Sequence, residues 1–457
     1  MKTKSNYSMN MCSGSIFKKM IRFAIPLMLS GVLQLLFNAA DIIVVGRFAG
    51  DNSLAAVGST TSIINLLTTL FIGMSVGVNV LVANYFAAKS EDDLEKTVHT
   101  AVSLSIISGI LLTVIGCVAA PQVLHLMQTP DEILDLAVTY LRTYFMGMTA
   151  VMIYNFGSAI LRGVGDTKRS LYFLTISGVI NVALNLVFVI ILKLDVLGVG
   201  LATVISQTVS AILVIVCLAK EKSAIKLNIK RLRINKEKFF RILQIGLPAG
   251  FQGVLFSLAN TFIQSSVNSF GKIVIAGNSA SANVEGFALT SMNAFHQAAI
   301  SFTGQNIGAG KLERVNKILY TSLGCVFVVA SIFSVIYIGF DEFLIGLYTE
   351  SDDVIKAGVK RLTIIAASYA LAGMMDAVVG SLRGMGYSFV PMVVSIGGIC
   401  ALRLIWLATV FQMEQYHTVE CIYITYPISW IVTLTGHLIC YIVIKKKMSL
   451  NFKKRYN

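Results

Sequence analysis

The chain has 457 residues, of which 56% are hydrophobic and 13% are charged. An average soluble protein has about 25% charged residues, and apolar segments long enough to cross a bilayer recur along this whole sequence. This composition excludes an ordinary soluble domain and predicts a polytopic helical membrane protein. The net charge of +14 does not indicate a nucleic-acid partner, because the basic residues lie in short loops beside the apolar segments, where they set topology and attract anionic lipid.

We predict twelve spans that form two lobes. The loops between spans are short except for a basic connector at 220–239, which separates an N-terminal six-helix lobe (1–219) from a C-terminal six-helix lobe (240–457). The predicted spans are 19–45, 54–84, 95–119, 133–161, 168–192, 197–219, 240–268, 275–305, 316–339, 354–381, 388–411 and 420–444.

The distribution of basic residues predicts the orientation. With these spans, 29 of the 37 Lys and Arg residues fall on one side, which is cytoplasmic by the positive-inside rule. Both termini are then cytoplasmic, and the protein is a multi-pass protein of the cell membrane. We expect the first span to remain as a helix, since it is too long for the apolar region of a signal peptide.

The two lobes repeat one sequence pattern. Pro26 corresponds to Pro248, and NYFAAK at 84–89 corresponds to NIGAGK at 306–311, both at the same offset along the chain. LRGVG at 161–165 corresponds to LRGMG at 382–386, at nearly the same offset. Six spans per repeat is an even number, so the repeats are parallel and related by an axis along the membrane normal. Such an arrangement suits alternating access, although a duplicated fold need not transport anything.

The first span carries an acid at membrane depth. Gln34, Asn38 and Asp41 recur at i, i+4 and i+7 and therefore share one helix face. A carboxylate in lipid costs several kcal/mol, so Asp41 marks a working site or, alternatively, lies solvated at the far interface. We predict a polar cavity in this lobe, although interhelical hydrogen bonding alone is an alternative. Its other members are Asn155, Asn181, Asn185, Thr203 and Gln207.

The C-terminal lobe carries a different polar set. Its members are Gln252, Glu285, Asp376 and Arg403. We expect Arg403 to pair with Asp376 or Glu285, which would make these acids structural, since a stable buried pair does not titrate. We expect His296 to be an ordinary interfacial residue.

Motifs for enzyme chemistry are absent or out of context. The sequence has no GxxxxGK[ST] loop and no HExxH, so ATP hydrolysis and zinc peptidase chemistry are not expected. GMSVG at 73–77 matches GxSxG but lies within a span, where it indicates close helix packing. The seven cysteines are interpreted as small buried residues. Uphill transport would then use an ion gradient, with no cofactor and no metal apart from the coupling ion, H⁺ or Na⁺.

Together these residues resemble the multidrug and toxic compound extrusion (MATE) family. The resemblance rests on Pro26, Asp41 and Gly46, and on AVG at 56–58, LRGVGD at 161–166, ASANVEGF at 280–287 and GQNIGAGK at 304–311. It implies a V-shaped, two-lobe exporter of organic, often cationic, compounds. It also implies a cation site at Asp41, Asn181 and Asn185. Many members have an acid where this chain has Asn185, and some have a Glu in the seventh span, which here has no acid.

We therefore predict an ion-coupled antiporter that exports small organic compounds, chiefly cationic ones. A one-acid site favours H⁺ over Na⁺. The alternatives are a flippase for lipid-linked or polysaccharide substrates, a membrane-embedded enzyme and a channel. The expected partners are membrane lipids and small organic substrates, and the expected state is a monomer.

Overall fold

The computed structural model describes residues 7–456, with side chains described for 7–450. Lys2 and Lys4, which contribute to the predicted topology signal, lie outside the described residues. The described chain is all-helical in class, as predicted, with turns and loops between the helices and no strand. Its α-helices are α1 (Ile16–Phe48), α2 (Asp51–Ala88), α3 (Glu91–Leu126), α4 (Asp131–Met146), α5 (Met148–Gly163), α6 (Lys168–Asn185), α7 (Asp195–Lys220), α8 (Lys236–Asn268), α9 (Lys272–Gly308), α10 (Leu312–Gly339), α11 (Asp341–Gly346), α12 (Asp352–Ala366), α13 (Tyr369–Gly384), α14 (Phe389–Ser395), α15 (Leu402–Ala408), α16 (Val419–Tyr423) and α17 (Thr425–Tyr456).

Most of these helices are long and apolar enough to cross a membrane. Within the described residues nine single spans meet this condition, and the bent pairs α4–α5 and α12–α13 raise the number to eleven. The remaining predicted span, 275–305, falls within α9, which has 37 residues and a polar buried set that includes Asn278, Glu285 and His296. The helices are therefore consistent with twelve spans, although α9 is less apolar than the others.

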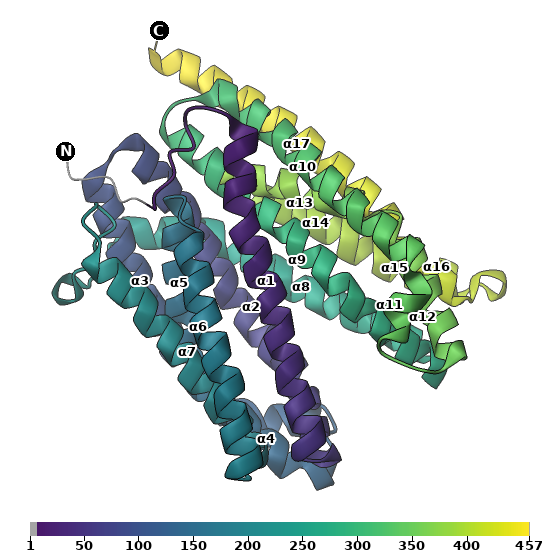
Figure 1. Cartoon of the computed structure of the whole chain (residues 1–457). Coiled ribbons are helices and arrows are strands. Elements are labelled where there is room, and N and C mark those ends of the chain that lie inside the picture. Colours follow the sequence, from purple (N-terminus) through teal and green to yellow (C-terminus); the bar gives the residue numbers. More distant parts are fainter. Residues whose placement is uncertain (1–6, 457) are drawn as a thin grey trace. The chain divides into compact units, whose positions relative to one another are not determined.

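The chain forms two compact units. The first comprises the chain up to Asn10 together with Leu29–Gly250, and the second comprises Met11–Met28 together with the chain from Phe251. The N-terminal part of α1 thus belongs with the second unit and that of α8 with the first. In the first unit α2 packs on α3, α4 and α5, and in the second α9 packs on α10, α12 and α13. Figure 1 traces these helices by colour along the chain.

Glycines allow α2 and the start of α8 to approach closely. A Cβ atom on Gly73 would lie 2.3 Å from the Cα of Gly250, and one on Gly77 would lie 2.3 Å from the carbonyl oxygen of Ile242. Backbone atoms cannot move aside as a flexible side chain can, so only glycine fits at these crossings. This confirms that GMSVG serves helix packing.

The predicted duplication is visible in the backbone. Gly50 and Gly271, which occupy corresponding positions in the two repeats, have φ angles of 87° and 88° and precede α2 and α9. Gly165 and Gly386 correspond in the same way and have φ angles of 90° and 89°. The bends match as well, at 44° between α4 and α5 and 49° between α12 and α13. Since positive φ angles favour glycine, these pairs mark the same turns in both halves.

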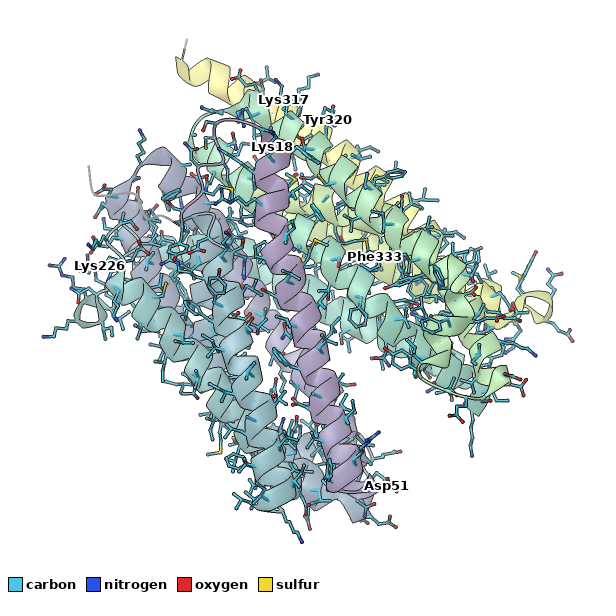
Figure 2. The ribbon with its side chains drawn as sticks, viewed as in Figure 1. Lys18, Asp51, Lys226, Lys317, Tyr320 and Phe333 are labelled. Atoms are coloured by element: carbon cyan, nitrogen blue, oxygen red, sulfur yellow. The ribbon has the colours of Figure 1, made fainter. Side chains whose placement is uncertain are left out.

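Large apolar side chains cover the outside of the helices. Val118, Val335 and Ile442 are each more than half exposed, as expected for residues that contact lipid. Charged groups gather at helix ends: Figure 2 shows Lys317 near one end of α10, whereas Phe333 lies farther along the same helix. The charged side chains buried within the units therefore need a specific explanation.

Candidate functional site

The candidate ion site lies where α1 meets α6. Asn185, at the last position of α6, donates a hydrogen bond from its amide nitrogen to the carboxylate oxygen Oδ1 of Asp41. The same nitrogen lies 3.4 Å from the side-chain oxygen of Asn181, one turn earlier. Asn185 is fully buried and Asp41 is half-buried. The structure thus brings together the three residues that the sequence predicts as the ion site.

A glycine on α6 makes this meeting possible. A Cβ atom on Gly178 would lie 1.8 Å from the ring of Phe37. Phe37 lies one helical turn before Asp41, and Gly178 lies two turns before Asn185. The absence of a side chain at Gly178 therefore lets α1 approach α6 closely enough for the Asp41 and Asn185 side chains to touch.

Asp41 has no basic neighbour among the described residues. No Lys, Arg or His nitrogen lies within 4.0 Å of its carboxylate in the part of the chain that the structure describes. Two tyrosines of α4, Tyr140 and Tyr144, lie within electrostatic reach of the carboxylate. Our sequence analysis missed both, although their i, i+4 spacing within a predicted span places them on one helix face. Among the described residues, the Asp41 carboxylate is thus held by one amide hydrogen bond and not by a counter-cation.

Among the described residues, no hydrogen bond joins the remaining predicted cavity residues to this cluster. Gln34 and Asn38 are exposed on α1. Asn155 donates to the carbonyl of Val151, and Thr203 to that of Val199, so both bond to their own helices. Gln207 is half-buried on α7. These positions stay candidates for a substrate cavity, but their side chains are not part of the ion site.

In the second unit, the partner of Glu285 is Arg361, not Arg403. Arg361 donates from Nε and Nη2 to the two carboxylate oxygens of Glu285, at 2.8 and 2.9 Å, and from Nη1 to Asn278 at 2.8 Å. Ser281 donates a further hydrogen bond to Glu285, at 3.0 Å. The expected pair with Arg403 was wrong because Arg361, near the middle of α12, offers this two-bond geometry.

Arg403 is stabilised by aromatic rings instead. Its Nε donates to the hydroxyl of Ser429 at 2.9 Å, and its guanidinium lies 4.0 Å from the centre of the Tyr426 ring and 5.9 Å from that of Trp430. Within the described residues no carboxylate lies in ion-pair range of Arg403. The negative faces of aromatic rings attract a cation, so they take the place of the acid that we expected.

Gln252 and Asp376 belong to a third group, around Arg383. Arg383 donates from Nη2 to the side-chain oxygen of Gln252 at 2.9 Å, and its Nη1 lies 3.4 Å from Nε2 of His296. His296 Nδ1 bonds to the backbone carbonyl of Asp376 at 2.7 Å. The expectation that His296 is interfacial was wrong, since it is 6% exposed. The predicted C-terminal cluster is therefore divided among three arginines, of which Arg361 and Arg403 share the ring of Tyr426.

The residues around Asp41 suit a monovalent cation or a proton. The oxygen donors available are the carboxylate of Asp41 and the amide oxygens of Asn181 and Asn185, and Oδ1 of Asn185 is buried with no hydrogen-bond partner. No group of three or more His, Cys, Asp or Glu residues capable of holding a metal ion occurs among the described residues. A single carboxylate with neutral oxygens around it can exchange one positive charge at a time.

Polar residues buried inside a bundle of apolar, membrane-length helices indicate a polytopic membrane protein with a functional polar interior. The MatE family model matches residues 26–187 and 248–408, one segment in each repeat. The chain therefore belongs to the MatE family and is a membrane transporter, not an enzyme.

Individual relatives agree with this assignment. The chain is 28% identical over 429 residues to "Probable multidrug resistance protein YoeA" of Bacillus subtilis, covering 92% of each chain. It is 23% identical to "Multidrug export protein MepA" of Staphylococcus aureus, covering 81% of this chain and 82% of that protein. The fold resembles a solved "outward-facing conformation of a multidrug resistance MATE family transporter", with a TM-score of 0.89, 21% identity and coverage of 99% and 100%.

Proposed function

We propose that the protein is a proton-coupled antiporter that exports organic, cationic compounds by alternating access. The observation that carries this proposal is the Asp41 carboxylate on α1, which is hydrogen-bonded to an amide and has no basic partner among the described residues. A negative charge without a counter-cation at membrane depth is costly. Binding a proton or a cationic substrate removes that cost, and the two compete for one charge.

Competition for the one charge of Asp41 links the movement of the proton to the movement of the cationic substrate. When Asp41 is ionised, it accepts the hydrogen bond from the amide nitrogen of Asn185, and a cationic substrate binds beside it. When Asp41 takes a proton, its carboxyl becomes a donor, and the Asn185 amide can turn so that Oδ1, which has no partner in this structure, accepts. Protonation thus replaces the substrate cation and rearranges the contact between α1 and α6.

The choice of H⁺ over Na⁺ rests on the number of charges. Na⁺ needs several oxygen ligands, and Asp41 is the one formal negative charge in this group, since Asn181 and Asn185 supply neutral oxygens. One proton neutralises that charge completely, whereas Na⁺ would have to give up its hydration shell for one carboxylate and two amides. The amide oxygens make weak Na⁺ binding the second candidate.

The names of the relatives support the substrate class. They describe a multidrug resistance protein and a multidrug export protein, and a negatively charged site favours the cationic members of such a set. We further propose that both termini face the cytoplasm of the cell membrane and that the protein works as a monomer. A flippase for lipid-linked or polysaccharide substrates is the alternative within transport.

Purified protein in proteoliposomes tests the coupling ion. A fluorescent cation such as ethidium should be transported across the membrane when a pH gradient is imposed without Na⁺. It should not be transported when a Na⁺ gradient is imposed without a pH gradient. Robust transport in the second condition would reject proton coupling. Transport of a lipid-linked oligosaccharide with no response to ethidium would favour the flippase.

A further inference from the structure

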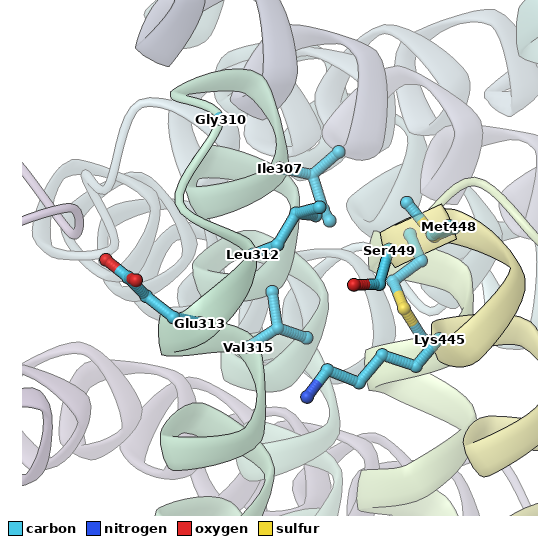
Figure 3. A pocket seen from close by; sticks show the side chains of 9 residues that line it. Ile307, Gly310, Leu312, Glu313, Val315, Lys445, Met448 and Ser449 are labelled. Carbon is cyan, nitrogen blue, oxygen red and sulfur yellow. The ribbon is translucent and has the colours of Figure 1, made fainter. Parts of the chain in front are cut away.

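A cavity of about 340 Å³ lies at one end of the second unit. It is formed where the end of α9, the start of α10, the residue after α13 and the last turns of α17 meet (Figure 3). This is the small end of the range for ligand sites. The residues that line the cavity include Ile307, Leu312, Val315, Lys445, Met448 and Ser449.

The cavity has an apolar floor and a basic edge. Val315 belongs to a buried apolar cluster, with Met448 packed against it. Lys445 and Ser449 are one turn apart on α17, so they lie on one face of that helix. Figure 3 shows the Lys445 side chain extended toward Val315, while Glu313 points away from Lys445.

Lys445 has no counter-ion in the part of the chain that the structure describes. It is half-buried, and no carboxylate lies within 4.0 Å of its amino group. Lys446 and Lys447 follow it and are exposed, which adds positive potential at the same level. A half-buried ammonium beside an apolar cavity selects a ligand with both an anionic group and a hydrocarbon part.

The position of the cavity indicates where such a ligand comes from. Lys445 directly follows Ile444, the last residue of the final predicted span, so it lies at the level of the lipid headgroups. This is also the side that the distribution of basic residues predicts as cytoplasmic. Basic pockets between helices on that side are suited to anionic lipid headgroups.

We propose that this cavity binds an anionic phospholipid. The phosphate lies between the amino group of Lys445 and the hydroxyl of Ser449, and the nearest hydrocarbon rests on Ile307, Leu312 and Met448. A cavity of this volume takes the headgroup region and the first methylene groups, and the rest of the lipid stays in the bilayer. The site is independent of Asp41 and of the proposed transport cycle.

Two substitutions distinguish a site from general attraction to a basic surface. Lys445→Gln removes the charge at the cavity, with Lys446→Gln as the matched control on the same helix. Ser449→Trp fills the cavity and leaves every charge in place, with Leu450→Trp as its control, since Leu450 is exposed and does not line the cavity. Both positions altered by Trp are exposed, so the variants are expected to fold.

The measurement is the binding of phosphatidylglycerol to the full-length protein in phosphatidylcholine nanodiscs. Native mass spectrometry detects the bound lipid. Lys445→Gln should weaken binding about tenfold, as expected for one charge-assisted hydrogen bond, and Ser449→Trp should abolish it, while both controls bind as the unmodified protein does. Equal weakening by Lys445→Gln and Lys446→Gln, or unchanged binding by Ser449→Trp, would overturn the site. Displacement of the bound lipid by inorganic phosphate at low concentration would identify a free-phosphate site and also overturn the proposal.

Discussion

The two units treat an acid at membrane depth in opposite ways. Within the described part of the first unit Asp41 meets an amide and no base, whereas in the second Glu285 is held by two hydrogen bonds from Arg361. Paired with a guanidinium, a carboxylate keeps its charge and its position. Held only by an amide, it can exchange its partner for a proton or another cation. The comparison supports the ion exchange that we propose for Asp41 and gives Glu285 a structural role.

The largest expected effect comes from removing the unpaired charge. Asp41→Asn should reduce coupled export to background, because the site can no longer bind a proton in exchange for a cation. Since Asp41 has no basic partner among the described residues, the change leaves no charge unpaired, and thermal stability should not fall. Drug efflux from cells lacking other pumps measures the first effect. Asp51→Asn, at an exposed position that begins α2, is the matched control and should transport normally.

The next effect comes from breaking the buried pair. Arg361→Met leaves Glu285 charged and alone, so the free energy of unfolding should fall by about 3–5 kcal/mol. Adding Glu285→Leu in the same protein should restore most of that loss, because an apolar pair replaces an ionic one. Thermal unfolding of the two single variants and the double variant forms the cycle. Strictly additive losses would show that the pair is not an energetic unit.

A smaller effect is expected at the crossing of α1 and α6. Gly178→Ala introduces a methyl group where the Phe37 ring lies, at an expected cost of about 1–3 kcal/mol from overpacking. The transport rate should fall well below that of the unmodified protein even at a temperature where the variant stays folded. The reason is that the Asp41–Asn185 contact depends on the close approach of α1 to α6. Gly58→Ala is the control, since nothing lies within 4 Å of its added Cβ. Normal transport by Gly178→Ala would show that the ion site does not depend on the close crossing of α1 and α6.

The smallest effect is expected at Arg403. It has no acid partner among the described residues, so Arg403→Met leaves no carboxylate alone and loses one hydrogen bond and its contact with Tyr426. The expected loss is about 2 kcal/mol or less. Thermal unfolding measured beside Arg361→Met gives the comparison directly. A loss at Arg403 as large as that at Arg361 would indicate an ion pair that the described residues do not contain.

The sequence was informative where spacing carries the signal. The constant offset of the repeats predicts the duplicated turns, whereas the meeting of Asp41 with Asn185 was implied by the resemblance to the MATE family. Spacing could not predict partners across helices in the second unit, because these depend on the bend between α12 and α13 and on which side chain reaches Glu285. Arg361 follows Lys360 in the first third of the predicted span 354–381, where the sequence suggests a base at the membrane interface. In the structure its side chain is buried, at 7% exposed.

The central claim is that a proton and a substrate cation compete for the one charge of Asp41. The most direct measurement is proton release when ethidium binds to the purified protein in lightly buffered solution, across a series of pH values. The account predicts release of about one proton per bound cation at pH values where Asp41 is protonated beforehand, falling as the pH rises and Asp41 ionises, and no release from Asp41→Asn. Binding of ethidium without proton release at every pH, or equal release from Asp41→Asn, would contradict it.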